Sequence, residues 1–147
     1  ILLVHGPNLN LLGERQPEIY GHGTLLEIEG DVAATANARG ATILAFQSNH
    51  EGALIDFLQE HRRRAAGIVI NAGALTHTSV SLRDALESVV LPAVEVHLSN
   101  VHAREPFRHR SLISAICIGQ VVGLGRAGYA AATNLLLDHL GVSAPRA

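Results

Sequence analysis

The chain has 147 residues, of which 48% are hydrophobic and 16% charged, so we expect one domain, residues 1–147, with a sizeable buried core. Its formal net charge of -2 gives no concentration of basic residues, which argues against nucleic acid and anionic membranes as partners. All 11 basic residues are arginines, and the absence of lysine excludes lysine imines, pyridoxal phosphate anchoring and a P-loop lysine.

Short apolar or β-branched segments alternate along the chain with longer amphipathic segments. Because this alternation is typical of a parallel sheet covered by helices, we predict an α/β, flavodoxin-like three-layer sandwich with a five-stranded parallel sheet. The predicted strands cover residues 1–5, 41–47, 67–71, 93–98 and 114–118. The predicted helices cover residues 24–39, 52–64, 76–89 and 125–140.

Several helix ends carry local signals. Thr24 followed by Glu27 forms a capping-box pattern that predicts a helix start. Gly40 and Gly141 are predicted stops for the first and last helices. The arginines at residues 62–64 end a predicted helix, where cations complement exposed carbonyl groups, so we interpret them as a solvated terminus.

Polar segments follow the predicted strands at residues 6–10, 71–79 and 97–100. Folds of this class place their sites at the carboxyl ends of parallel strands, so these segments are the expected site. The loop that begins at Gly6 is long and contains Tyr20, one of only two tyrosines in the chain. Long loops of this kind are usually functional, so Tyr20 is a candidate site residue. The other tyrosine, Tyr129, is predicted to serve packing.

Other chemistries find little support in the sequence. The nine histidines form no H-E-x-x-H motif, and Cys117 is the single cysteine, which suits a buried small side chain and permits no intrachain disulfide. No G-x-S-x-G motif is present. Residues 123–128 match the dinucleotide fingerprint literally, but no further strand or acidic ribose partner follows, and we attribute these glycines to close helix packing.

The location is expected to be cytoplasmic. The longest apolar run, residues 112–125, contains Ser114 and Gln120 and is too short to span a bilayer. The chain starts directly in a strand-like segment without a charged leader.

Five segments together resemble type II 3-dehydroquinate dehydratase. The resemblance covers nearly the whole chain, with the motifs in the order and spacing of that family. The main departures are Arg110 and Leu112, where the family often carries histidine and tyrosine. The segments are Gly-Pro-Asn-Leu-Asn at 6–10 with its continuation to residue 21, Gln-Ser-Asn-His-Glu-Gly at 47–52, Asn-Ala-Gly-Ala-Leu-Thr-His-Thr-Ser at 71–79, Glu-Val-His-Leu-Ser-Asn at 95–100 and Arg-Glu-Pro-Phe-Arg at 104–108.

The resemblance implies a lyase that removes water from 3-dehydroquinate in an anti elimination through an enolate, giving 3-dehydroshikimate without a cofactor or metal. The same reaction serves aromatic amino acid and chorismate biosynthesis by the shikimate pathway and quinate breakdown, and the sequence leaves this choice open. The resemblance also implies a homododecamer made of four trimers. A small-molecule substrate and further copies of the chain are therefore the expected partners.

By this resemblance, Tyr20 is the base and Arg15 is the cation that favours its phenolate, because a free phenol titrates near pH 10. Asn8 resembles the residue that holds a water against the enolate oxygen; a turn-forming asparagine is the alternative. His97 is implied as the general acid, with Glu95 on the same strand face to orient and charge its ring.

The remaining implied site residues bind substrate. Asn71, Leu98 and Ser99 match a carboxylate pocket, and His77 and Arg108 match residues that bind the ring hydroxyls. Asp84 matches a residue that reaches a neighbouring subunit's site; without the resemblance it would be a surface helix residue. Glu51 and Arg104 are assigned scaffold roles only.

The alternative function is a non-catalytic flavodoxin-like binding or signalling domain. A receiver domain requires an aspartate where this chain has Asn71, and a lysine that is absent. A flavodoxin requires a hydroxyl-rich phosphate loop after its first strand and aromatic residues beside the flavin. Residues 6–10 supply neither, so the strand ends disfavour both variants of this alternative.

Overall fold

The strands form a single parallel sheet in the order β2-β1-β3-β4-β5. The computed structural model describes residues 1–14, 17–20 and 22–143, without the side chains of Pro17 and Tyr20. The strands are β1 (Leu2–His5), β2 (Leu44–Gln47), β3 (Ile68–Asn71), β4 (Ala93–His97) and β5 (Gly119–Val122). β1, β3 and β4 are buried throughout, as expected for strands covered on both faces, and the predicted five-stranded sheet is confirmed.

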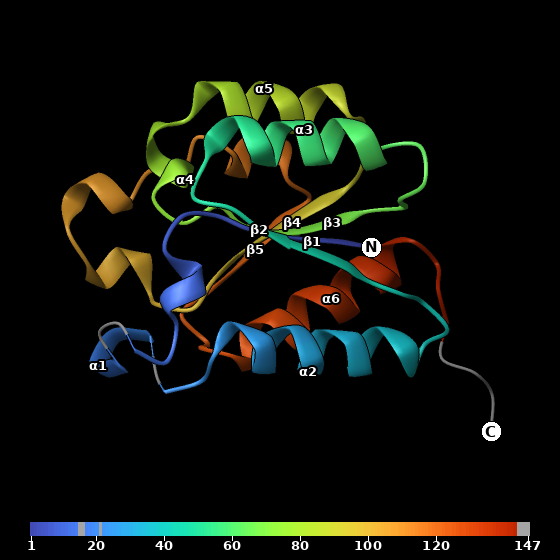
Figure 1. Cartoon of the computed structure of the whole chain (residues 1–147), viewed down its shortest axis with the longest axis horizontal. Coiled ribbons are helices and arrows are strands. Elements are labelled where there is room, and N and C mark those ends of the chain that lie inside the picture. Colours follow the sequence, from blue (N-terminus) through green and yellow to red (C-terminus); the bar gives the residue numbers. More distant parts are fainter. Residues whose placement is uncertain (15–16, 21, 144–147) are drawn as a thin grey trace.

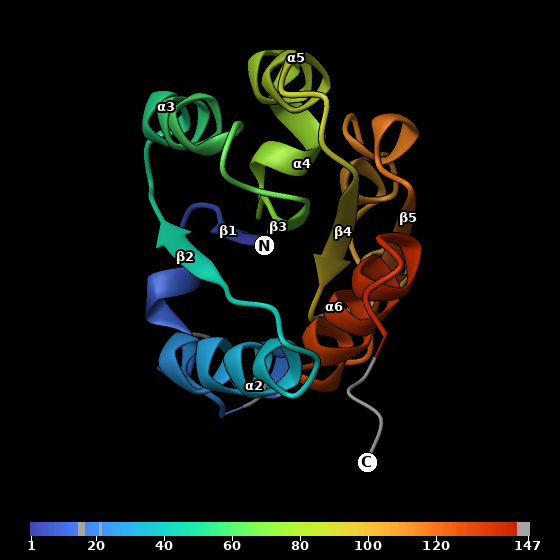
Figure 2. The ribbon, with the colours of Figure 1, turned by 90° about the vertical axis from the view of Figure 1, so that its right-hand side faces the viewer.

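Helices cover both faces of the sheet (Figure 1, Figure 2). On one side lie α3 (Glu51–His61), α4 (Leu75–Thr78) and α5 (Val80–Ser88), and on the other α2 (Leu25–Asn37) and α6 (Ala127–His139). The predicted three-layer sandwich is therefore confirmed. The short helix α1 (Pro17–Tyr20) lies near the start of α2 (Figure 1). The 3₁₀ helices are η1 (Leu9–Leu11), η2 (Val101–Ala103), η3 (Pro106–Arg108) and η4 (Ser114–Ile116).

Two apolar cores lie on the opposite faces of the sheet. The core beneath α3 and α5 includes Leu54 and Leu58. The core beneath α2 and α6 includes Ile28, Leu136 and Tyr129. In the part of the chain that the structure describes, no helix combines the length and apolar character needed to cross a membrane.

The predicted strand at residues 114–118 is wrong. Ser114–Ile116 forms a 3₁₀ helix, and the strand β5 begins only at Gly119, which pairs with Val94. The Ser111 hydroxyl accepts hydrogen bonds from the backbone N–H groups of Ile113 and Ser114, which folds this segment into a turn before the strand. The mostly apolar composition of residues 112–118 concealed that turn.

The predicted helix at residues 76–89 is divided. α4 ends at Thr78, and Ser79 adopts an extended conformation with φ -95° and ψ 100°. Its hydroxyl accepts a hydrogen bond from the Leu82 N–H and thereby caps the start of α5. The Glu51 carboxylate accepts a hydrogen bond from the same hydroxyl, which agrees with the scaffold role predicted for Glu51.

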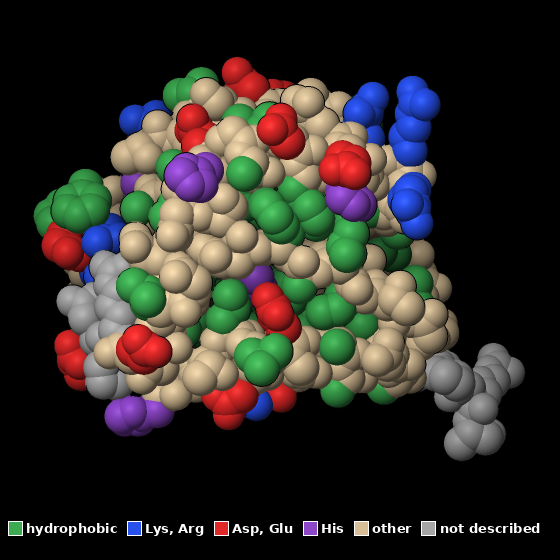
Figure 3. Space-filling view, viewed as in Figure 1, with side chains coloured by type: hydrophobic (Ala, Val, Ile, Leu, Met, Phe, Trp, Pro, Cys, Tyr) green, Lys and Arg blue, Asp and Glu red, His purple; other side chains and the backbone are tan. Residues whose placement is uncertain are grey.

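The local signals at other helix ends are confirmed. Thr24 and Glu27 form the capping box of α2. Gly40 and Gly141 have left-handed φ angles of 72° and 71° just beyond α2 and α6. Arg62 donates a hydrogen bond to the Gln59 carbonyl, and arginine side chains project at the end of α3 (Figure 3).

Close helix packing explains only part of the glycine-rich segment at residues 123–128. Gly123 and Gly125 have φ angles of 83° and 56°, so they serve the turn between β5 and α6. Only Gly128 lies on a packed helix face, where a Cβ would contact Val121 at 3.4 Å.

Candidate active site

A pocket opens at the carboxyl ends of β1, β3 and β4, where the sequence placed the site. Gly6 allows the loops after β1 and β3 to meet there, because a Cβ at this position would lie 2.2 Å from the Ala72 carbonyl oxygen. Of the residues singled out from the sequence, the following line the pocket: Asn8, Asn71, His77, His97, Leu98, Ser99 and Arg108.

A buried histidine–carboxylate pair lies at the end of β4. The Nε2 atom of His97 is 2.6 Å from Oε1 of Glu95, which is fully buried. The other oxygen of Glu95 accepts a hydrogen bond of 3.0 Å from the Ser111 hydroxyl. This arrangement holds the ring in one orientation and leaves Nδ1 as the ring nitrogen available to another partner.

His77 lies beside His97 and belongs to α4, in the connection between β3 and α5. The two imidazole rings are stacked with a centroid distance of 6.4 Å and an interplanar angle of 17°. Nδ1 of His77 is 2.8 Å from the backbone carbonyl of Arg110. Donation to that carbonyl places the proton on Nδ1 and leaves Nε2 as an acceptor for a ligand hydroxyl.

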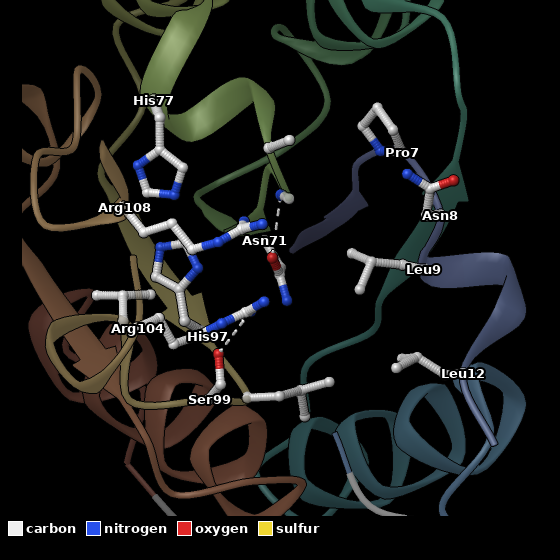
Figure 4. A pocket seen from close by; sticks show the side chains of 14 residues that line it. Pro7, Asn8, Leu9, Leu12, Asn71, His77, His97, Ser99, Arg104 and Arg108 are labelled. Carbon is white, nitrogen blue, oxygen red and sulfur yellow. Dashed lines mark hydrogen bonds between the residues drawn. The ribbon is translucent and has the colours of Figure 1, made fainter. Parts of the chain in front are cut away.

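The Asn71 side chain lies between the two walls of the pocket (Figure 4). Its Oδ1 accepts a hydrogen bond of 3.1 Å from the Gly73 N–H, and its Nδ2 donates one of 2.9 Å to the Tyr129 hydroxyl. One further Nδ2 hydrogen remains for a ligand, which suits an anion.

Two arginines from the segment after β4 line the same wall as His97 (Figure 4). Arg108 donates from Nε to Oε2 of Glu105 at 2.8 Å. The pKa of Glu105 lies below its usual value because the carboxylate accepts hydrogen bonds from its own backbone N–H and from Arg108, with a smaller coulombic contribution from the two arginines. Arg104 contacts the Ser99 hydroxyl at 3.4 Å and the Glu105 carboxylate at 3.6 Å. Glu105 is thus a shared counter-ion of the two guanidinium groups, both of which line the pocket.

Asn8 lies on the opposite wall with Pro7, Leu9 and Leu12 (Figure 4). Its backbone is left-handed with φ 68°, and its N–H donates to Oδ1 of Asn49 at 2.9 Å. Asn8 therefore shapes a turn through its backbone while its side chain lines the pocket.

Four predicted site residues are not among the described residues that line the pocket. Arg15 lies outside the described residues, and so does the Tyr20 side chain, although the Tyr20 backbone ends α1. Asp84 is exposed on α5 and does not line this chain's pocket. Glu95 does not line the pocket but contacts it through His97. Among the described residues, no group of three or more histidine, cysteine or acidic side chains is arranged to hold a metal ion.

Comparison with known proteins identifies the family. The model of the class II dehydroquinases matches residues 1–137. The chain belongs to this family. A 3-dehydroquinate dehydratase of Ruegeria pomeroyi is 54% identical, with 95% of this chain and 94% of the relative covered. A catabolic 3-dehydroquinase 1 of Neosartorya fischeri is 58% identical, with coverage of 91% and 89%. The crystal structure of a type II dehydroquinase from Butyrivibrio crossotus has a TM-score of 0.89 at 44% identity, with coverage of 92% and 94%.

The two departures from the type II dehydroquinase pattern contact the site through their backbones. Arg110 offers its carbonyl to His77, and the Leu112 N–H donates to the Thr76 carbonyl at 2.8 Å. A backbone carbonyl is present in every residue and a backbone N–H in every residue except proline, so the side chains at Arg110 and Leu112 leave these contacts intact.

Sequence reasoning underestimated two residues of this class II dehydroquinase. Arg104 was assigned a scaffold role but lines the pocket; its place in a polar segment just after His97 was the available signal. Tyr129 was assigned to packing, and although it is fully buried, its hydroxyl accepts a hydrogen bond from Asn71. The sequence carried no signal for that contact, because the two residues are 58 positions apart.

Proposed function

We propose that this chain is a hydro-lyase that converts 3-dehydroquinate to 3-dehydroshikimate by anti elimination of water through an enolate, with residues 1–147 acting as one domain. The observation that carries the proposal is the pocket of a class II dehydroquinase in which the buried His97–Glu95 pair lies beside the amide of Asn71 and the guanidinium of Arg108. This combination provides a proton donor next to groups that bind an anion.

His97 acts as the general acid toward the departing hydroxyl. The Glu95 carboxylate at 2.6 Å stabilises the imidazolium form, which carries a proton on Nδ1 as well as on Nε2. The Ser111 hydroxyl holds the other carboxylate oxygen, so the acid is oriented by two hydrogen bonds in series.

The charged wall of the pocket binds the substrate. Asn71, Ser99 and the backbone at Leu98 receive the carboxylate, and His77 and Arg108 bind ring hydroxyls. The fixed hydrogen bonds of Asn71 and His77 support this assignment, because both side chains are oriented before a ligand arrives. Arg104 adds positive charge beside Ser99 and thereby favours an anionic substrate.

The loop after β1 supplies the base. Tyr20 as its phenolate removes the proton next to the ketone, and Arg15 favours the phenolate by its charge. Asn8, on the wall opposite His97, holds a water against the developing enolate oxygen.

An ultraviolet assay with 3-dehydroquinate alone tests the proposal, because the product is a conjugated enone and the substrate is not. We expect absorbance to rise without added nucleotide or metal ion. A wild-type protein that produces no rise would contradict the proposed reaction and favour a non-catalytic binding domain.

The route is tested by borohydride trapping. An enolate route forms no bond between protein and substrate, and the chain has no lysine for an imine. The protein mass should stay unchanged after borohydride is added during turnover. A substrate-derived mass adduct that requires borohydride would contradict the enolate route.

Assembly into a homododecamer, with Asp84 completing a neighbour's site, and a cytoplasmic location belong to the same proposal. The exposure of Asp84 on α5 is consistent with contact to another subunit. Sedimentation should show a particle about 12 times the chain mass of 15.6 kDa. A fully active monomer would contradict the assembly.

A further inference from the structure

A chain of buried polar side chains extends from the Asn71 amide away from the pocket. It runs from Asn71 on β3 to the Tyr129 hydroxyl on α6 and then to His5 on β1, with distances of 2.9 Å and 3.5 Å. Nε2 of His5 lies 3.6 Å from the Glu29 carboxylate on α2. His5 and Tyr129 are fully buried, and the roles proposed above do not use them.

The direction of each hydrogen bond in this chain follows from its neighbour. The Gly73 N–H occupies Oδ1 of Asn71, so the amide must present Nδ2 to the Tyr129 oxygen. The Tyr129 proton is then donated to Nδ1 of His5, the other polar atom that the structure places beside this hydroxyl. Nδ1 is therefore bare, and the His5 proton is on Nε2, which lies 3.6 Å from the Glu29 carboxylate and has no hydrogen-bond partner among the described residues.

Two observations support a neutral His5 in this arrangement. Burial lowers the pKa of His5 to about 4, so the ring carries a single proton near neutral pH. Burial also raises the pKa of Tyr129, so its hydroxyl keeps the proton that it donates. The hydrogen bonds from Asn71 through Tyr129 to His5 therefore have one consistent set of donors and acceptors.

We propose that Tyr129, held by His5, is a positioning residue that fixes the Asn71 amide so that its second Nδ2 hydrogen faces the substrate carboxylate. Rotation of the amide would break the bond from Gly73 and leave the Tyr129 oxygen without its donor. The inference rests on the proposed function for the identity of the anion. It extends the carboxylate site to two buried residues outside the pocket.

The test compares Tyr129→Phe with Thr133→Val. Thr133 is also fully buried on α6, and its hydroxyl donates to the Tyr129 carbonyl without contacting the pocket, so it controls for loss of a buried hydroxyl. For Tyr129→Phe we expect KM for 3-dehydroquinate to rise about tenfold with kcat within about twofold, since a bond to an anion is lost in both ground and transition states. Thr133→Val should leave both constants unchanged.

Titration calorimetry with quinate and its methyl ester separates anion positioning from a general disturbance of the fold. Tyr129→Phe should weaken quinate about tenfold and leave the uncharged ester unaffected. The positioning role would be overturned if Tyr129→Phe weakened the binding of quinate and of its methyl ester equally. It would also be overturned if Tyr129→Phe and Thr133→Val bound quinate with equal affinity. If the wild-type protein did not turn over 3-dehydroquinate, the proposed function would be overturned. If the wild-type protein turned over normally and Tyr129→Phe bound quinate as wild type does, only the positioning role would be overturned.

A second pair of variants decides the matter if Tyr129→Phe does not fold. His5→Asn keeps an acceptor near the position of Nδ1, whereas His5→Leu removes it at similar size. His5→Leu should weaken quinate selectively, and His5→Asn should bind quinate within about twofold of wild type. If His5→Leu and His5→Asn bound quinate with equal affinity, the proposed role of His5 in holding Tyr129 would be overturned.

Discussion

The two walls of the pocket differ in how their polar groups are held (Figure 4). One wall is formed by the end of β4 and the segment that follows it. There His97 contacts the Glu95 carboxylate, and Arg108 contacts the Glu105 carboxylate. On the wall after β1, Asn8 is accompanied by Leu9 and Leu12, which are buried and apolar.

This difference separates two tasks. Charged groups that are already paired and oriented bind an anion without further ordering. Variants on the wall that carries Arg108 should therefore mainly affect substrate binding, except at the proton donor His97 and its partner Glu95. An apolar wall displaces water and continues into the loop that carries Arg15 and Tyr20, so variants in that loop should mainly affect the chemical step. The following predictions test this division, beginning with the largest effect.

Tyr20→Phe should lower kcat by about 10³-fold and leave KM nearly unchanged, because a general base contributes about 10²–10⁴-fold. Steady-state kinetics and circular dichroism measure the effect and the integrity of the fold. Glu18→Gln in the same short helix is the matched control, since Glu18 is exposed. If Tyr20→Phe turned over at nearly the wild-type rate, Tyr20 would serve only as an apolar cover.

Arg15→Ala should lower kcat by about 10²-fold at neutral pH. Removal of the cation returns the Tyr20 phenol toward its solution pKa near 10, so less phenolate is present at neutral pH and more forms as pH rises. The variant should therefore recover activity toward alkaline pH, and Arg15→Lys should be affected less. A loss that is equal at every pH would place Arg15 in substrate binding instead.

Glu95→Gln should lower kcat by about 10²-fold, since the imidazolium of His97 loses its counter-charge while the hydrogen bond from Ser111 can persist. Ser111→Ala removes only that outer hydrogen bond, and its effect on kcat should be several times smaller. Both are measured as pH profiles of kcat. If Glu95→Gln changed KM alone, the pair would belong to binding and the proposed acid would be wrong.

Replacement of His5 should change the pH dependence of stability. The pKa of His5 is about 4 in the folded state and 6.5 in the reference state, so the unfolded chain binds more protons between these values. Wild type should lose up to about 3 kcal/mol of stability to this group as pH falls from 6.5 to 4, and none above 6.5.

Urea unfolding of wild type and His5→Asn across that range isolates the contribution of His5, because the other titrating groups are common to both. Leu54→Ala, in the apolar core beneath α3, serves as the comparison and should cost about 2–5 kcal/mol at every pH. Parallel pH curves for wild type and His5→Asn would show that His5 does not titrate in the folded state as expected.

Local patterns were sufficient wherever one short segment decides the outcome. The strands β1 to β4, the capping box of α2 and the glycine stops depend on hydrophobic runs and single caps, and these predictions are confirmed. The division between α4 and α5 depended on which conformation Ser79 takes, and helix periodicity through residues 76–89 concealed it.

The sequence determined the fold class and the edge of the sheet where the site lies. Its resemblance to a known family indicated Asn8, Asn71, His77, His97 and Arg108, and these residues line the pocket. Tertiary structure decided the start of β5, the entry of Arg104 into the pocket and the bond between Asn71 and Tyr129. The physical reason is that periodicity reports which face of an element is buried. It does not report which buried groups from distant elements meet, and a polar atom in a core acquires its function from the partner it finds there.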